Sequence, residues 1–241
     1  VVASATSASI AVQSNKTWKV RCHDEWISKF TTSGEGNGTI ELAFEANSSK
    51  KESRTASIQV IGETTSFTIA FVQNKIATSV AEIVAQLTST NSNEQSPYEV
   101  DLTEAGAVVS YVNGKNAFIE DKTGGILLYK QDHGLTAGMK ISGTVKGSGY
   151  LYSNLPEITS IDGATTEAGG DIPLTELTLA ELLSNYDRYI NCRVLLKGVT
   201  VADPIASSDR DGKIAQDGKD VAVRAQNSTL KMPLGTCDFI C

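Results

Sequence analysis

Apolar and polar side chains alternate through short segments of residues 1–75, and this alternation is what most limits how the chain can fold. The segments are SASIAVQSN, TWKVRC, TIELAFEAN, RTASIQVIG and TSFTIAFVQN, with turn-forming clusters such as TSGEGNG and NSSKKES between some of them. A period of two places one face of a strand in a core and the other in solvent. Short strands at regular spacing therefore predict a β-sandwich over residues 1–75.

Five of these stretches, in this order and spacing, resemble one known family. They are SNKTWKV, DEWI, TSGEGNGTIELAFEAN, RTASIQV and IAFVQN, and they cover nearly all of residues 8–75. The order and spacing are similar to those of the BACON domain, whose name stands for Bacteroidetes-associated, carbohydrate-binding, often N-terminal. The resemblance implies an immunoglobulin-like sandwich and a role in carbohydrate binding outside the cell.

From residue 76 onward, two short helices are predicted, each followed by strands. Ser79 and Glu82 have the spacing of a helix-capping box, and Thr178 and Glu181 repeat that spacing 99 residues later. The apolar stripes predicted for the two helices are Val80, Ile83, Val84, Leu87 and Leu179, Leu182, Leu183, Tyr186. The strand segments AFIEDKTGGILLY and KIAQDGKDVAVR then follow, and Asp121 and Asp217 align as the start of a tight turn in each. We therefore expect an internal duplication.

AFIEDKTGGILLY looks like the second and third strands of an OB-fold, a small Greek-key barrel. The resemblance implies an all-β chain with an OB-like barrel over residues 76–170 and a second OB-like unit over 171–241, each with a leading helix. Similar OB-like units often follow BACON modules in secreted or surface lipoproteins of gut Bacteroidetes. The second copy stops at CDFIC, where a fourth strand is expected to begin, so a closing strand is expected beyond Cys241.

Candidate binding residues cluster in the first OB-like unit. Tyr150, Tyr152 and Asn154 lie in VKGSGYLYSNLPEI, the connection that frames ligands in OB-folds, and Phe118 and Tyr129 lie on the neighbouring hairpin. These aromatic rings with Asn154 are suited to stacking on a sugar ring or a base, although the tyrosines are equally suited to plugging the barrel or facing another domain. In TWKVRCHDEWISKF, the alternation places Trp18 in the core, whereas Trp26 follows a polar loop and is a further candidate ligand contact.

No catalytic, metal or cofactor site is predicted. The only histidines, His23 and His133, lie in different units, and no nucleophile, zinc or phosphate-binding motif is present. Asp209-Arg-Asp-Gly begins like a calcium loop but lacks the later acidic ligands. The four cysteines, Cys22, Cys192, Cys237 and Cys241, form no CxxC pair and are expected to be small buried residues.

The charge distribution argues against nucleic acid as a partner. Residues 76–170 carry 5 basic and 11 acidic side chains, and the whole chain has a net charge of −7. Neutralising phosphates requires a surplus of Lys and Arg. We expect a non-catalytic protein, secreted or on the outer cell surface, that binds glycan or polysaccharide, with a lipid anchor upstream of Val1 and no transmembrane segment. The alternatives are a structural spacer and an OB-fold unit that binds nucleic acid.

Overall fold

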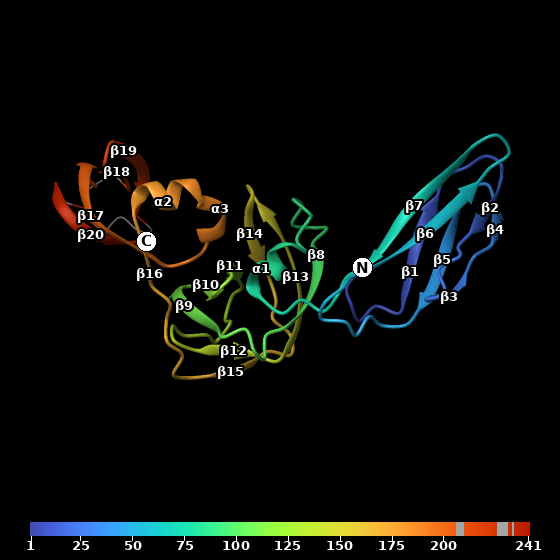
Figure 1. Cartoon of the computed structure of the whole chain (residues 1–241), viewed down its shortest axis with the longest axis horizontal. Helices are drawn as coiled ribbons and strands as arrows, with labels where there is room; N and C mark the ends of the chain where they lie inside the picture. Colours follow the sequence, from blue (N-terminus) through green and yellow to red (C-terminus); the bar gives the residue numbers. More distant parts are fainter. Residues whose placement is uncertain (206–209, 226–230, 233) are drawn as a thin grey trace.

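The computed structural model describes residues 1–205, 210–225, 231, 232 and 234–241. It is nearly all β, with about 52% of residues in strands and 6% in three short helices, which confirms the all-β prediction. The described residues form three separate hydrophobic cores along the chain. Figure 1 shows the parts that contain them in a row, with the middle unit between the N-terminal sandwich and the C-terminal unit.

The N-terminal unit is a two-sheet β-sandwich. The first sheet has the strand order β1-β5-β3, and the second has the order β4-β2-β6-β7. The strands are β1 (Ser7–Val12), β2 (Thr17–Arg21), β3 (Ile27–Phe30), β4 (Ser33–Glu35), β5 (Gly38–Phe44), β6 (Arg54–Ile61) and β7 (Ser66–Gln73). The alternation seen in the sequence orients them: Ile40, Leu42 and Phe44 of β5 are buried, and Glu41 is exposed. Trp18 is a core residue, as predicted.

Charged side chains join the sandwich to the middle unit. The Ser4 backbone N–H donates to the Glu99 carboxylate at 2.8 Å, and the Lys146 ammonium lies 3.3 Å from that carboxylate. Lys50 of the sandwich pairs with Asp101 at 2.6 Å. Glu99 is buried while both lysines are about half exposed. These contacts fix residues 1–6 and the loop near Lys50 against the middle unit.

The middle unit packs helix α1 (Val80–Val84) against an eight-stranded sheet. Its strand order is β15-β12-β9-β10-β11-β14-β13-β8. The strands are β8 (Ser96–Asp101), β9 (Ala107–Asn113), β10 (Asn116–Asp121), β11 (Gly124–Tyr129), β12 (Lys140–Ser142), β13 (Thr144–Tyr152), β14 (Leu155–Ile158) and β15 (Thr165–Glu167). Strand β14 is antiparallel to β13 and parallel to β11.

This sheet curls but does not close. Strand β8 pairs with β13. Strand β9, which follows β8 in the chain, pairs with β12, which precedes β13. The sheet therefore bends where β8 is followed by β9 and β12 is followed by β13. Within the described part of the chain no sheet closes into a barrel, which corrects the prediction of two barrels. The chain is not in strand conformation between β8 and β9 or between β12 and β13. The row of hydrogen-bonded strands therefore begins at β15 and ends at β8, and these two end strands do not pair with each other.

The C-terminal unit consists of two helices and a smaller sheet. Strands β16, β17, β18 and β19 lie in that order, and β20 pairs with β17. The elements are β16 (Thr175–Leu177), α2 (Leu179–Ser184), α3 (Tyr186–Tyr189), β17 (Val194–Asp203), β18 (Asp211–Gln216), β19 (Lys219–Arg224) and β20 (Gly235–Ile240). Leu179, Leu196 and Val199 form the centre of its core.

The middle and C-terminal units use one hairpin device, but its residues align differently from the sequence prediction. Asp121 ends β10 and accepts a hydrogen bond from the first N–H of α1, at Val80 (2.9 Å). Gln216 ends β18 and accepts the corresponding bond from Leu179 of α2 (2.8 Å). Asp217 is instead the first residue of the turn, with φ 48°. Gln216 rather than Asp217 is therefore the equivalent of Asp121, because the hairpin register sets the match.

The helix caps agree with the prediction except at one contact of α1. The apolar stripe predicted for the second helix is partly wrong. Thr178 and Glu181 form the complete capping box on α2. On α1, Ser79 caps the N–H of Glu82, but the Glu82 carboxylate bonds the N–H of Thr78. Two residues of the second stripe are exposed: Leu183 lies in the last turn of α2, and Tyr186 lies beyond the end of α2, at the start of α3.

All four cysteines carry free thiols, but none is fully buried as predicted. Cys22 and Cys192 are half-buried, while Cys237 and Cys241 are exposed. Cys237 is on β20, and Cys241 is the residue directly after the end of that strand. Phe239, which lies on the same side of β20 as Cys237, packs against the core of the C-terminal unit, whereas Cys237 is exposed.

Candidate functional site

One face of the middle sheet carries a continuous row of side chains across five strands. Directly opposed residues in neighbouring strands point to the same side of a sheet. In the order β9, β10, β11, β14, β13, the row is Tyr111, Phe118, Leu127, Glu157 and Tyr150, each directly opposite the next. Tyr129 of β11 and Tyr152 of β13 lie two residues from this row and share its face. We call Tyr111, Phe118, Tyr129, Tyr150 and Tyr152 the aromatic face.

The rings of the aromatic face are accessible and contact one another. Tyr152 is 57% exposed, Tyr111 47% and Tyr129 37%, whereas Phe118 and Tyr150 are half-buried. The ring centroids of Tyr111 and Phe118 lie 6.0 Å apart, and those of Tyr150 and Tyr152 lie 6.5 Å apart at nearly a right angle. The edge contact between Tyr150 and Tyr152 fixes the planes of these two rings while leaving other ring faces available.

A buried carboxyl group lies within the row, between Leu127 and Tyr150. Glu157 is 8% exposed and hydrogen-bonds to the Tyr150 hydroxyl. Burial raises the pKa of Glu157, and the bond from Tyr150 opposes that shift. Burial, followed by the neighbouring Glu157, raises the pKa of Tyr150. The pair therefore holds the Tyr150 ring in a fixed orientation and presents polar atoms between aromatic rings.

The polar groups beside Tyr129 add hydrogen-bonding capacity at one edge of the face. The Lys115 ammonium lies 4.2 Å from the centroid of the Tyr129 ring, in cation–π geometry. Asn116 is directly opposite Tyr129 on the neighbouring strand. Its side-chain oxygen is buried and has no hydrogen-bond partner. An acceptor without a partner is costly unless a ligand or water satisfies it.

The C-terminal unit covers the opposite edge of the face. The Arg193 backbone N–H donates to both Glu120 carboxylate oxygens, at 3.2 and 3.3 Å. The Asn191 side-chain amide donates to the Pro156 carbonyl at 3.1 Å. Burial raises the pKa of Glu120, and the hydrogen bonds from Ser110 and Arg193 oppose that shift. This segment therefore borders the aromatic face without covering its tyrosines.

The structure gathers four of the six predicted site residues and separates the other two. Phe118, Tyr129, Tyr150 and Tyr152 share the aromatic face, whereas Asn154 lies in the turn beyond β13 with φ 69°. Trp26 lies in the sandwich, outside this face. There its ring stacks on Phe71 (centroids 5.9 Å apart), meets the edge of Phe44, and has the Arg54 guanidinium 4.3 Å from its centroid. The Trp26 ring is therefore part of the sandwich core.

Sequence reasoning missed Tyr111, Lys115, Asn116 and Glu157. Tyr111 follows an apolar run, VVS, and has the pattern of an ordinary strand residue. Glu157 is one of many acidic side chains, and nothing local predicts that it is buried. The register of the β9–β10 hairpin could have identified Tyr111. Once the turn that joins these two strands is located, the register places Tyr111 opposite Phe118.

No metal centre or histidine-based site is evident in the part of the chain that the structure describes. No cluster of three or more potential metal ligands occurs there. His133 accepts the backbone N–H of Leu135, and its other ring nitrogen lies 3.1 Å from the Gly114 carbonyl. Asp209, the first residue of the calcium-like stretch, lies outside the described residues. None of the helices in the described ranges has the length and hydrophobicity needed to span a bilayer.

The fold and the face define a modular β protein: a sandwich joined to two curled-sheet units, with an exposed aromatic surface on the middle one. Residues 16–74 match the BACON family model, described as "Putative binding domain, N-terminal", and these 59 of the 241 residues form a BACON domain. No curated protein matches the chain.

One solved structure shows a low similarity, the "Bacteroides ovatus GH5 xyloglucanase in complex with a XXXG heptasaccharide". It is 21% identical to the chain, with a TM-score of 0.29. The matched region covers 39% of this chain and 21% of that one, so the chain spans about a fifth of that protein's length. A TM-score this low does not establish a shared fold.

Proposed function

We propose that this protein binds glycan on the aromatic face of its middle unit and has no catalytic activity of its own. The observation that supports the proposal is the cross-strand row from Tyr111 to Tyr150, with Tyr129 and Tyr152 beside it. The BACON domain, whose family model is described as a binding domain, supports a binding role for the chain as a whole.

The chemistry of the face matches that of a sugar chain. A pyranose ring has apolar C–H faces and a rim of hydroxyl groups, so it is recognised by aromatic rings with polar groups at their edges. Tyr111, Tyr129 and Tyr152 supply accessible rings, and the Lys115 ammonium beside Tyr129 supplies a hydrogen-bond donor. The row crosses five strands about 4.8 Å apart, so it extends over roughly 20 Å, the length of several sugar units.

We further propose that the chain acts at the outer cell surface or as a secreted protein, held by a lipid anchor upstream of Val1. The proposal rests on the BACON domain and on the residues that resemble its family. A nucleic-acid partner is less favoured, because residues 76–170 have more than twice as many acidic as basic side chains.

The test is to replace two tyrosines that lie side by side on the face. The wild-type chain is screened against a broad array of plant, microbial and host glycans. Affinity for the best ligand is then measured by isothermal titration calorimetry. The double variant Tyr150→Ala/Tyr152→Ala is expected to bind at least tenfold more weakly, about 1.4 kcal/mol. Its melting temperature is measured alongside, because Tyr150 also contacts Glu157.

The control is Phe67→Ala on β7 of the sandwich. Phe67 is 56% exposed, which matches Tyr152 at 57%. The control variant is expected to retain full affinity. The proposal is wrong if the wild type binds no glycan on the array, if the double variant binds as well as the wild type, or if Phe67→Ala removes binding instead.

A structural spacer is the second candidate, and the bonded junction between sandwich and middle unit favours it. Glu99 ties the Ser4 backbone and Lys146 together there, and Lys50 pairs with Asp101. Such a junction holds neighbouring units at a fixed separation. A chain that only spaces other domains would bind no glycan in the same array.

A further inference from the structure

The aromatic face of the middle unit has a polar border along one side. Residues two positions from the row share its face, because side chains alternate along a strand. On one side of the row these residues are Asn113 of β9, Asn116 of β10, Tyr129 of β11, Thr159 directly after β14, and Ser148 of β13. Asn113 is opposite Asn116, and Asn116 is opposite Tyr129. We call Asn113, Asn116, Ser148 and Thr159 the polar edge.

Hydrogen bonds orient two hydroxyl groups of the polar edge. The Ser148 and Thr159 hydroxyls both donate to the Gln95 side-chain oxygen, at 2.8 and 2.7 Å. The Gln95 amide in turn donates to the Ser92 carbonyl at 3.1 Å. A hydroxyl group that donates its one hydrogen keeps lone pairs that accept. Ser148 and Thr159 are half-buried, so these acceptors lie at the rim of the aromatic face, where sugar hydroxyl groups can donate to them.

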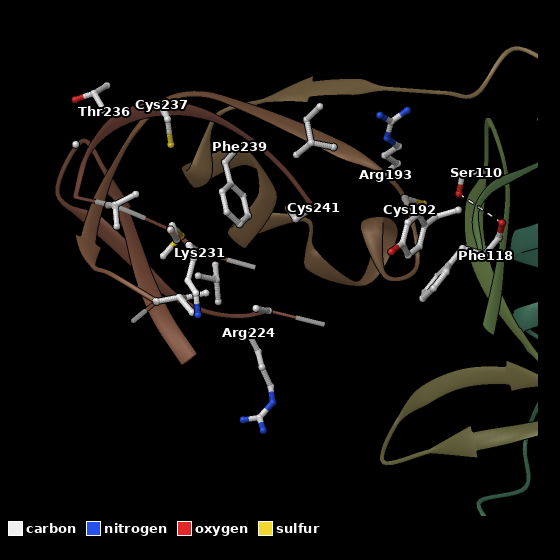
Figure 2. A pocket seen from close by; sticks show the side chains of 18 of the residues that line it. Ser110, Phe118, Cys192, Arg193, Arg224, Lys231, Thr236, Cys237, Phe239 and Cys241 are labelled. Atoms are coloured by element: carbon white, nitrogen blue, oxygen red, sulfur yellow. Dashed lines mark hydrogen bonds between the residues drawn. The ribbon is translucent and has the colours of Figure 1, made fainter. Parts of the chain in front are cut away.

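The C-terminal unit borders the row on the other side, beside β10 and β11. Glu120 and Gly125 lie on that side and are directly opposite each other. Glu120 accepts the Arg193 backbone N–H, and the Asn191 backbone lies against Gly125. Figure 2 shows Arg193 on the side of the C-terminal unit that faces Phe118. A ligand that lies along the row therefore has protein on this side and the open polar edge on the other.

The charges near the row distinguish uncharged from acidic sugars. Neither the row nor the polar edge contains Arg or Lys, the residues that bind anionic groups by charge-assisted hydrogen bonds. Lys115 contacts the face, with its ammonium over the Tyr129 ring. Glu157, within the row, has no ion-pair partner among the described residues. Residues 76–170 carry 11 acidic and 5 basic side chains, so an acidic sugar would approach a surface of its own charge.

We propose that the aromatic face selects an uncharged glycan, which lies along the row across the strands with hydroxyl groups turned toward the polar edge. The inference rests on the proposed function and adds the class of sugar to it. The exposed rings contact the apolar faces of the sugar rings, and Ser148 and Thr159 accept hydrogen bonds from sugar hydroxyl groups. A sugar carboxylate in the same place would lie near Glu157, and pairing it with Lys115 would remove that ammonium from the Tyr129 ring.

The test compares each glycan with a charged form and an esterified form of itself. Neutral glycans are arrayed beside forms whose primary hydroxyl groups are oxidised to carboxylates, and beside the methyl esters of those forms. Polygalacturonate and other naturally acidic glycans are arrayed beside their carboxyl-reduced forms. The intact protein is expected to bind each neutral ligand about tenfold or more tightly than its carboxylate form, because like charges in contact are costly. The methyl ester is larger than the carboxylate but uncharged, so it is expected to regain most of the lost affinity.

The salt dependence of binding is a second measurement on the native protein. Affinity for the neutral ligand is expected to change less than twofold between about 50 and 500 mM NaCl, because no ion pair with the ligand contributes to it. A steep loss of affinity with salt would contradict an uncharged ligand.

Two double variants locate the hydroxyl contacts. Ser148→Ala/Thr159→Val removes both acceptors and is expected to weaken binding of the neutral ligand about fivefold or more. Thr55→Val/Ser57→Ala makes the same changes at exposed positions of β6 in the sandwich and is expected to leave binding unchanged. Melting temperatures of both variants are measured alongside. The comparison of neutral and carboxylate ligands on the native protein does not depend on the folding of either variant.

The inference is overturned, while the proposed function stands, if a carboxylate form binds as tightly as its neutral counterpart and Tyr150→Ala/Tyr152→Ala weakens that binding. It is also overturned if the methyl ester binds as weakly as the carboxylate, since size and not charge then decides. Full affinity of Ser148→Ala/Thr159→Val would overturn the contact with the polar edge. If the protein binds no glycan on the array, the proposed function itself is wrong and this inference is wrong with it.

Discussion

Gly125 is the position at which a single methyl group should separate the C-terminal unit from the middle unit. It lies on β11, and a Cβ atom there would be 2.5 Å from the Asn191 carbonyl carbon and 2.9 Å from the Cys192 backbone nitrogen. Both partners are backbone atoms, so no side-chain rotation relieves the clash. Ordinary contact begins near 3.4 Å. The segment around Asn191 must therefore move by about 1 Å in Gly125→Ala.

A movement of this size removes the hydrogen bonds of the junction. The Arg193 N–H lies 3.2 and 3.3 Å from the Glu120 carboxylate oxygens, and the Asn191 amide lies 3.1 Å from the Pro156 carbonyl. Overpacking typically costs about 1–3 kcal/mol. A hydrogen bond to a charged group contributes about 1.5–3 kcal/mol. We expect the contact between the two units to weaken by about 2–4 kcal/mol, while the core of the middle unit remains folded.

Cys192 provides a local assay for this separation. Burial, followed by the nearby Glu120, raises the pKa of its thiol to about 11, from 9.0. The thiolate is the species that reacts with alkylating reagents. Full return to the ordinary pKa would raise the thiolate fraction at pH 8 by roughly 100-fold. In a background with the other three cysteines replaced by serine, Gly125→Ala should speed alkylation of Cys192 at least tenfold.

The matched control is the neighbouring Gly124→Ala. A Cβ at Gly124 would lie 3.8 Å from the nearest atom, the Ala81 Cβ, which is ordinary contact. Its alkylation rate should equal that of the parent. Equal rates for both glycine variants would refute the reasoning, because the Asn191 backbone would then not rest on Gly125.

Two further predictions concern Glu120 and Trp18. Burial raises the folded-state pKa of Glu120, so its stabilising contribution is complete below the ordinary Glu value of about 4.5 and is lost as the pH rises through the folded pKa. In denaturant titrations from pH 4 to 7, wild type should therefore lose stability relative to Glu120→Gln as the pH rises, and parallel pH curves would contradict this. Gly34→Ala would place a Cβ 2.6 Å from two atoms of the Trp18 ring and should destabilise the sandwich by about 1–3 kcal/mol in thermal unfolding. The control Gly62→Ala, with its nearest contact at 3.4 Å, should change little, and equal effects of the two would count against tight packing on Trp18.

The candidate site was predictable as a set of aromatic residues but not as a surface. Phe118, Tyr129, Tyr150 and Tyr152 were identified from their place on a hairpin and its neighbouring connection. Their meeting with Tyr111 depends on the register of the β9–β10 hairpin, and their meeting with Glu157 depends on the pairing of β11 with β14, which are not consecutive strands. Local alternation cannot predict which strands become neighbours.

Local physical chemistry determined the strands of the sandwich and the caps of the helices. The period of two buries Ile40, Leu42 and Phe44, and the Thr178–Glu181 spacing predicts a capping box that forms as expected, because each needs only residues a few positions apart. Tertiary structure alone decided that Gln216 takes the role of Asp121, that Trp26 joins a core, and that the curled sheet stays open. These outcomes depend on register and on strand order, which are set by contacts between distant segments.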